Sequence, residues 1–336
     1  MSVFKTIFQG YIKGEHPSED DTRKALTAIL SGDSDDGQIG AFLMGLEMVG
    51  VTASDIRIGA ELMRANMTAV SIPGRIVDTV GTGGDGLSTY NISTAAAFVC
   101  AGAGAKVAKH GSRAVSSKSG SSDVLTALGV GLDIPPGRAA MCVEDCGVGF
   151  LFAPKHHSAM RHVTAARASL GIRSLFNLLG PMSNPAGAKR QLIGVFDKKW
   201  AKPMAEALRD LGSEHVWIVH GSDGLDEITT TGKTFVTELK DGKIKAFTIK
   251  PEDYGIPIAK IEDLRGGNSE VNAEAVMALL NGRDGPYRDI VVLNAAATLL
   301  VAGVADNMED GIARANKSID DGDAYKALAA LIRNTH

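Results

Sequence analysis

Cysteine is scarce in this chain of 336 residues, which contains only Cys100, Cys142 and Cys146. Three thiols do not make a disulfide framework. Cys142 and Cys146 lie one helical turn apart, but no second pair of cysteines or histidines stands at ligand spacing. We therefore interpret these two residues as buried thiols and not as metal ligands.

An excess of charge of one sign and long hydrophobic runs are lacking as well. The 35 basic and 39 acidic side chains leave a net charge of −4, which argues against a nucleic-acid binder that relies on a basic surface. No stretch reaches the length of a membrane helix, and the longest apolar run, residues 290–305, is interrupted by Asn294 and Thr298. The N-terminal residues MSVFKTIFQG contain no cleavable apolar core, so the sequence predicts a cytoplasmic protein.

The order of the apolar patterns predicts two domains. Residues 1–70 show only helical patterns, with Ser18 and Thr52 as expected N-caps. From residue 75 onward, short apolar runs alternate with helical segments, which predicts βαβ units and a mainly parallel sheet. We therefore expect an α/β protein with a small all-helical domain, residues 1–70, and a large α/β domain, residues 75–336. The expected strands are 76–80, 106–109, 149–152, 192–196 and 216–220, with a hairpin at Asp241-Gly242.

Glycine is abundant, at 39 residues, and three loops between residues 77 and 123 suit phosphate groups. The first, residues 81–86, is rich in glycine, which lets backbone N–H groups approach an anion closely. The second supplies Asn91, Ser93 and Thr94, and the third brings Lys109, Arg113, Ser116 and Ser117. Each loop alone is more often a tight turn, a helix cap or surface charge. Together, at the carboxyl ends of strands, they indicate one ligand with several phosphates.

Carboxylates near these loops indicate a cation. Asp85 lies within the glycine-rich loop, and Asp226-Glu227 follow the expected strand 216–220. Hard cations take oxygen ligands, and a carboxylate beside bound phosphates usually means that a cation bridges them. By itself, the acidic pair is equally explained as a solvated turn. With Asp85 and Ser93 on the same edge of the sheet, the sequence predicts one or two magnesium ions held against a diphosphate.

Two histidines and two arginines between residues 156 and 173 are further candidates. We interpret His156 and His157 as packing and hydrogen-bonding residues near the pocket, in preference to metal ligands or general bases. Arg167 or Arg173 suits the carboxylate of an acidic substrate, because the guanidinium fork matches carboxylate geometry. A structural ion pair explains each arginine equally well.

The motifs GTGGDG, NIST, KHGSRAVSSKSG and LGIRSLFNLLGPMSNPA, with the Asp226-Glu227 pair, resemble those of the anthranilate phosphoribosyltransferases in order and spacing. The resemblance extends over essentially the whole chain. It implies a small helical domain joined by a hinge to a large α/β domain, and a homodimer formed through the helical part, on which part of residues 165–190 would pack. It also implies the reaction: the phosphoribosyl group of 5-phosphoribosyl 1-pyrophosphate passes to the amine of anthranilate, with magnesium, in tryptophan biosynthesis.

The resemblance assigns roles to individual residues. Magnesium would be bound by Ser93, Asp226 and Glu227. Anthranilate would contact Gly81, Ser112 and Arg167, with Arg167 facing its carboxylate. No covalent nucleophile and no general base is assigned, so the main tasks are positioning and charge neutralisation. Phosphoribosyl pyrophosphate would be bound by Gly81, Gly84, Asp85, Thr89, Asn91, Ser93, Thr94, Lys109, Gly111, Ser112, Arg113, Ala114, Val115, Ser116, Ser117 and Ser121.

Ser112 departs from the family, whose loop usually has asparagine at this position. Serine is shorter and offers one donor where an amide offers two, which leaves the affinity for the acceptor, or its choice, open. One alternative is therefore a phosphoribosyltransferase for another aromatic acceptor. A second is a pyrimidine nucleoside phosphorylase. The acidic pair counts against it, because such an enzyme uses inorganic phosphate and no metal-bound diphosphate.

Overall fold

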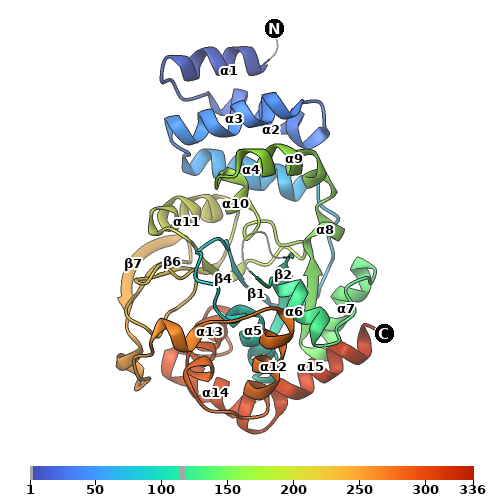
Figure 1. Cartoon of the computed structure of the whole chain (residues 1–336), viewed down its shortest axis with the longest axis vertical. Coiled ribbons are helices and arrows are strands. Elements are labelled where there is room, and N and C mark those ends of the chain that lie inside the picture. The colour runs from blue at the N-terminus through green and yellow to red at the C-terminus, as the bar shows by residue number, and fades with distance from the viewer. Residues whose placement is uncertain (1–2, 114–117) are drawn as a thin grey trace.

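A group of helices stands at one end of the molecule, and a sheet flanked by helices forms the rest (Figure 1). The computed structural model describes residues 3–113 and 118–336. The N-terminal helices are α1 (Val3–Ile12), α2 (Glu19–Ser31), α3 (Asp36–Val49) and α4 (Ala53–Ala65). Two later helices, α9 (Arg161–Leu170) and α10 (Leu175–Leu179), join them: α9 packs on α2 and α3, and α10 packs on α4. The helical group is thus built from two distant stretches of the chain.

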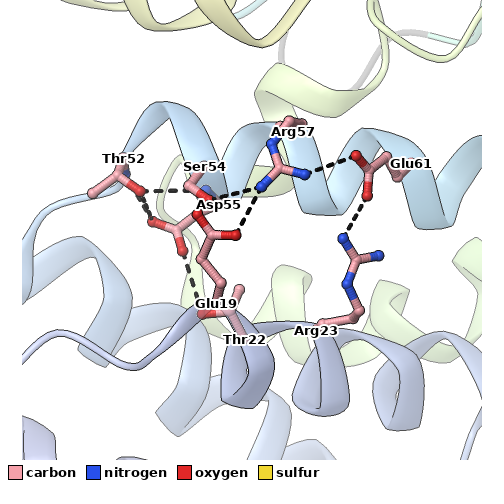
Figure 2. Close-up of polar contacts among 8 residues, drawn as sticks. All are labelled: Glu19, Thr22, Arg23, Thr52, Ser54, Asp55, Arg57 and Glu61. Atoms are coloured by element: carbon pink, nitrogen blue, oxygen red, sulfur yellow. Dashed lines mark hydrogen bonds and ion pairs between the residues drawn. The ribbon is translucent and has the colours of Figure 1, made fainter. Parts of the chain in front are cut away.

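Side-chain caps fix where α2 and α4 begin. The hydroxyl of Ser18 accepts from the N–H of Asp21 at 3.1 Å, and Thr52 forms a reciprocal capping box with Asp55, so both predicted N-caps are confirmed. Figure 2 shows that Asp55 also joins the two helices, since its carboxylate accepts from the hydroxyl of Thr22 at 3.3 Å. Beside it, Arg57 on α4 pairs with Glu19 on α2 at 2.9 Å.

We expect Asp55→Ala to lower the free energy of unfolding by roughly 2–4 kcal/mol, because it removes a helix cap and leaves the buried hydroxyl of Thr22 without its acceptor. Urea unfolding followed by circular dichroism measures the change. Glu19→Ala is the matched control: Glu19 forms an ion pair between the same helices, but its side chain is 66% exposed, so its loss should leave the midpoint unchanged. Equal effects of the two substitutions would contradict the assignment.

The sheet confirms the expected α/β fold. In the described residues its strands lie in the order β3-β2-β1-β4-β5-β6-β7. Those from β1 to β5 are parallel, and β6 and β7 form the expected antiparallel hairpin, whose turn residues Asp241 and Gly242 both have positive φ. The strands are β1 (Ile76–Gly81), β2 (Lys106–Gly111), β3 (Val148–Phe152), β4 (Arg190–Gly194), β5 (His215–Gly221), β6 (Thr234–Lys240) and β7 (Lys243–Ile249).

The remaining helices cover the two faces of the sheet. On one face, α5 and α13 pack against the central strands; on the other, α11 packs against β5 and β6 and also contacts α4, so that this core continues into the helical group. No helix of the described residues is long and apolar enough to cross a membrane. These helices are α5 (Ile92–Gly102), α6 (Ser121–Ala127), α7 (Pro136–Cys146), α8 (Ala153–His156), α11 (Ala201–Asp210), α12 (Ser269–Leu280), α13 (Pro286–Ala302), α14 (Met308–Asp320) and α15 (Asp323–Asn334).

Three details differ from the sequence-based expectation. Strand β4 covers Arg190–Gly194, two residues earlier at each end than the expected strand 192–196, although the N–H of Val195 still donates to the carbonyl of Val219 at 2.9 Å. Helix α14 is not among the predicted elements, since its buried face is narrow and it contains Gly311. Cys142 is buried as expected, but Cys146 is only half-buried and accepts from the side-chain amide of Asn334 at 3.1 Å.

Candidate active site

The order of the strands creates a topological switch point at the carboxyl ends of β1 and β4, the place where open α/β sheets form their ligand crevice. From β1 the chain moves outward through β2 and β3, and then returns to place β4 on the opposite side of β1. Such a switch point is where open α/β sheets bind ligands. The glycine-rich loop after β1 lies here, and Gly83, Gly84 and Gly86 have φ of 66°, 79° and 80°, a region that other residues rarely adopt.

The turn after β5 reaches this loop. The N–H of Gly83 donates to Oδ2 of Asp226 at 2.7 Å, and a Cβ at Gly81 would collide with the same carboxylate. Asp226 is buried, and burial together with the charges of Asp85 and Glu227 raises its pKa well above the ordinary value. The structure therefore brings three carboxylates from two loops to one point, and they repel one another there.

Glu227 faces the start of α5. Its Oε1 accepts from the N–H of Ser93 at 3.2 Å, so the carboxylate lies at the positive end of that helix. Burial raises the pKa of Glu227 to about 7, although Lys109 and Ser93 act in the opposite direction.

Lys109 places a positive charge beside Ser93 and Glu227. It is only 4% exposed, and its Nζ donates to the carbonyl of Thr79 at 2.7 Å and to Oγ of Ser93 at 3.3 Å. Burial lowers the pKa of Lys109, while the charges of Asp78 and Glu227 raise it. The ammonium group of Lys109 therefore lies buried between β1 and the start of α5.

Asp78, a buried carboxylate beneath the site, is a residue that sequence reasoning missed. It accepts from the N–H of His110 at 3.1 Å and from Nδ2 of Asn184 at 2.8 Å, and burial raises its pKa to about 6. The available signal was its place in the apolar strand 76–80, where an acidic residue is unexpected. Asn184 also donates to the carbonyl of Ala108, so one amide ties β1 to β2.

The side chain of Asn91, which precedes α5, is oriented by the C-terminal helices. Its Oδ1 accepts from Nδ2 of Asn272 in α12 at 2.8 Å, and its backbone carbonyl accepts from the hydroxyl of Tyr287 in α13 at 3.2 Å. The Asn91 amide in turn donates to the carbonyl of Ser119 at 3.3 Å. Sequence reasoning missed Asn272 and Tyr287, because these contacts cross more than 180 residues of chain.

The other predicted phosphate-binding residues that the structure describes end or follow strands β1 and β2. Thr89 forms a β-bridge with Arg265, and Thr94 is buried in the first turn of α5. Gly111 ends β2, and the carbonyl of Ser112 accepts from Oγ of Ser121 at 3.2 Å. Arg113 is exposed. Ala114, Val115, Ser116 and Ser117 lie outside the described residues.

The two candidate arginines have different surroundings. Arg173 donates to the carbonyl of Gly84 and stacks over the ring of Phe196 at 4.4 Å, so it holds the glycine-rich loop. Arg167 is half-buried, makes a long contact of 3.5 Å to Oδ1 of Asn177, and has a pKa lowered by burial. Neither arginine forms an ion pair within residues 3–113 and 118–336, which counts against the structural ion-pair interpretation.

His156 and His157 are both buried. Nδ1 of His156 lies 2.7 Å from the carbonyl oxygen of Thr68. The ring of His157 packs at 5.1 Å from that of His110. Burial lowers the pKa of each of these three histidines. The contacts agree with a hydrogen-bonding role for His156 and with a packing role for His157.

The donor set fits magnesium. Asp85, Asp226, Glu227 and the hydroxyl of Ser93 are all oxygen donors, and the raised pKa values of Asp226 and Glu227 show that the carboxylates lack sufficient compensating charge. In the part of the chain that the structure describes, no three acidic, histidine or cysteine side chains are grouped so that they could hold a metal ion by themselves. Mg²⁺ is usually bound by one or two carboxylates together with water and substrate phosphates, so an open site of this kind suits it.

Comparisons with known proteins agree along the whole chain. The helical bundle domain of the glycosyl transferase family matches residues 5–67, and the a/b domain of that family matches residues 73–325. Anthranilate phosphoribosyltransferase from Parvibaculum lavamentivorans is 52% identical over 100% of this chain and 98% of its own length. The protein of the same name from Rhodopseudomonas palustris CGA009 is also 52% identical, over 99% of this chain and 98% of its own.

Solved structures give the same picture. Anthranilate phosphoribosyltransferase from Thermus thermophilus superimposes with a TM-score of 0.92 and 40% identity, covering 100% of this chain and 99% of the other. The Saccharomyces cerevisiae enzyme in complex with PRPP and Mg has a TM-score of 0.90 and 29% identity, covering 99% and 97% of the two chains.

Proposed function

The chain belongs to the glycosyl transferase family as an anthranilate phosphoribosyltransferase, and on this premise we propose how its residues carry out the reaction. The enzyme transfers the phosphoribosyl group from 5-phosphoribosyl 1-pyrophosphate to the amine of anthranilate, giving N-(5-phosphoribosyl)anthranilate and pyrophosphate in tryptophan biosynthesis. The bond from the anomeric carbon to the pyrophosphate oxygen breaks, the bond to the amine nitrogen forms, and the amine loses a proton to solvent. The observation that carries the proposal is the meeting of Asp85, Asp226 and Glu227 beside the glycine-rich loop.

We assign Mg²⁺, as one or two ions, to Ser93, Asp226 and Glu227. The all-oxygen donor set supports this, as does the yeast relative whose structure contains PRPP and Mg. When bound, Mg²⁺ supplies positive charge to the departing pyrophosphate.

The protein's own groups position the sugar phosphate. Backbone N–H groups of the loop at Gly81, Gly84 and Asp85 and the positive end of α5 would bind the diphosphate, because both lie at the crevice. Lys109 would add a buried positive charge. We extend this binding role to Thr89, Asn91, Ser93, Thr94, residues 111–117 and Ser121, which follow the same three loops.

Anthranilate would lie between the glycine-rich loop and α9. Arg167 is free of ion pairs among the described residues and is half-buried, so its guanidinium suits the carboxylate of the acceptor. Gly81 and Ser112 would contact the aromatic amine from the other side. We assign no covalent nucleophile and no general base, since the amine attacks as the pyrophosphate leaves and positioning supplies most of the rate.

The proposal includes a homodimer formed through residues 1–70 and a cytoplasmic location. Exposed apolar side chains on the helical group support the dimer: Ile12 on α1 is 87% exposed, and Met44 and Met48 on α3 are 43% and 75% exposed. Apolar residues gathered on one surface are typical of contacts between protein chains.

The direct test is to incubate the protein with phosphoribosyl pyrophosphate, Mg²⁺ and anthranilate while following the loss of anthranilate fluorescence. We expect loss that depends on all three components. Turnover with another aromatic amine, but not with anthranilate, would instead support the alternative that Ser112 raises. Phosphate-dependent cleavage of a pyrimidine nucleoside would support a phosphorylase.

We expect Ser112→Asn to lower the KM for anthranilate by roughly fivefold, about the value of one additional hydrogen bond. The amide offers a second donor where serine has one, and the loop is already held through the backbone carbonyl of residue 112, which the substitution keeps. The KM for phosphoribosyl pyrophosphate is the internal control and should change little. A higher KM for anthranilate in the variant would show that this chain has adapted its acceptor site to serine.

A further inference from the structure

Asn294 is a polar residue in a helix that is otherwise almost entirely apolar and buried. It lies in the middle of α13, which packs against β1, β4 and β5, and its side chain is fully buried. Asparagine is a poor helix former, and burying its amide is unfavourable unless every polar atom finds a partner. A leucine would fill this position at lower cost if packing were its only role.

The amide of Asn294 clamps the backbone of one residue in another element. Its Oδ1 accepts from the N–H of Ile228 at 3.0 Å, and its Nδ2 donates to the carbonyl of Ile228 at 2.8 Å. The second hydrogen of Nδ2 goes to the carbonyl of Ile290, one turn earlier in α13, at 2.8 Å. Both donors of the amide are therefore used, and both backbone groups of Ile228 are held by a single side chain.

Ile228 directly follows the acidic pair Asp226-Glu227. Leu225 and Ile228, on either side of the pair, are fully buried in the core, so the two carboxylates project from a short turn anchored at both ends. From the crevice side, the N–H groups of Gly83 and Ser93 hold the carboxylates. From the core side, Asn294 holds the backbone.

A second set of hydrogen bonds, made by Asp223, closes the loop that follows β5. The carboxylate of Asp223 accepts from the hydroxyls of Thr229 and Thr231 at 2.7 and 2.6 Å, and from the N–H of Leu225 at 3.1 Å. These bonds tie the two ends of the loop together but do not reach the backbone at Ile228. The peptide group that follows Glu227 is thus fixed to the helices by Asn294.

We propose that Asn294 is a positioning residue for the metal-binding turn: its amide fixes the backbone after Glu227, so that the two carboxylates keep the spacing needed for Mg²⁺ and a diphosphate. The inference rests on the proposed function. Metal ligands must be held to within about half an ångström by groups that do not themselves touch the metal. Such supporting groups typically change metal affinity by about 10–100-fold when they are removed.

The experiment compares Asn294→Leu with Thr298→Val. Thr298 lies one turn further along α13, is fully buried, and donates to the carbonyl of Asn294 at 2.9 Å. Its replacement by valine removes a buried hydrogen bond from the same helix but none from the turn. Both variants should lose stability, and only Asn294→Leu should change the turn.

Two measurements distinguish a general loss of stability from a change in the metal-binding turn. Hydrogen exchange of the metal-free protein should become faster in the peptide that covers residues 222–231 of Asn294→Leu and stay as in the parent in Thr298→Val. Calorimetric titration of phosphoribosyl pyrophosphate at a series of Mg²⁺ concentrations, without acceptor, should show the half-saturating Mg²⁺ concentration raised roughly 10–100-fold in Asn294→Leu. The KM for anthranilate should stay within about twofold, as expected for an independent site.

Asn294→Ala removes the same hydrogen bonds without adding a larger apolar side chain, so it should show a similar change in Mg²⁺ dependence and serves if the leucine variant does not fold. Parent-like Mg²⁺ dependence in a folded Asn294 variant overturns the inference. A parent chain that binds no phosphoribosyl pyrophosphate at any Mg²⁺ concentration overturns the proposed function instead. If the parent chain binds no phosphoribosyl pyrophosphate, hydrogen exchange still tests the positioning role. An unchanged exchange rate of residues 222–231 in Asn294→Leu would contradict that role.

Discussion

Asp226→Asn/Glu227→Gln should lower turnover by at least roughly 10³-fold, since both carboxylate charges at the diphosphate site are removed while the side-chain shape is kept. The amide oxygens can still accept from the N–H groups of Gly83 and Ser93, so the local fold is retained. Initial rates at saturating Mg²⁺ measure the effect. Glu252→Gln/Asp253→Asn, an exposed acidic pair elsewhere, is the matched control and should be fully active. A double variant at 226 and 227 with parent activity would refute the metal assignment.

The same variant should melt at a higher temperature than the parent when metal and substrates are absent. The folded-state pKa of Glu227 is raised to about 7 from an ordinary value of 4.5, and that of Asp226 is raised as well. A raised pKa in a carboxyl group means that ionisation costs the folded state stability, and this cost grows as the pH rises from the ordinary value to the folded one. The gain in melting temperature should therefore vanish towards about pH 4 and increase as the pH rises through about 7, the folded pKa of Glu227. A loss of stability at the higher pH would contradict this interpretation.

Lys109→Met should reduce turnover by roughly 10²-fold, because the buried positive charge beside Ser93 and Glu227 is lost. It should also lower the free energy of unfolding by roughly 3–5 kcal/mol at about pH 8, since Asp78 and Glu227 then lack a buried cation. The stability loss should shrink near pH 6, where these carboxyl groups take up protons. Rates and denaturant unfolding at the two pH values measure both effects.

Lys106→Met, at the start of the same strand, is the control for Lys109→Met, because Lys106 donates only to the carbonyl of Pro73 at the opposite edge of the sheet. Adding Glu227→Gln to Lys109→Met should restore part of the stability without restoring turnover. Full activity in Lys109→Met would remove this lysine from the site.

The features that sequence predicted well are those decided locally. Ser18 and Thr52 start helices through bonds to residues three positions away, and Asp241-Gly242 makes a hairpin because both positions adopt positive φ. The parallel strands are recognisable because each is a short apolar run between helical patterns. The predicted bounds of β4 are two residues late, because the strand begins with the polar residues Arg190 and Gln191, which do not belong to the apolar run.

The residues of the candidate site also fall into those that could be predicted from local sequence and those that could not. The glycine-rich loop, the start of α5 and the acidic pair are contiguous motifs, so their meeting at one edge of the sheet follows from the βαβ order. The partners that hold them are separate amides. Asn184, Asn272 and Asn294 each hold a residue of the site from 66 to 181 positions away in the chain, and no local pattern identifies such a partner.

The origin of the helical group in two stretches of chain has a mechanical consequence. The backbone crosses between this group and the sheet at residues 66–75, again at 157–160, and again at 180–189. A domain joined to the rest of the chain by a single connection can rotate freely about it. A domain joined at several separate points can move only by a hinge motion about the line between them. A break in the first crossing would also leave both fragments bound to each other, because α9 and α10 remain interlocked with α2, α3 and α4.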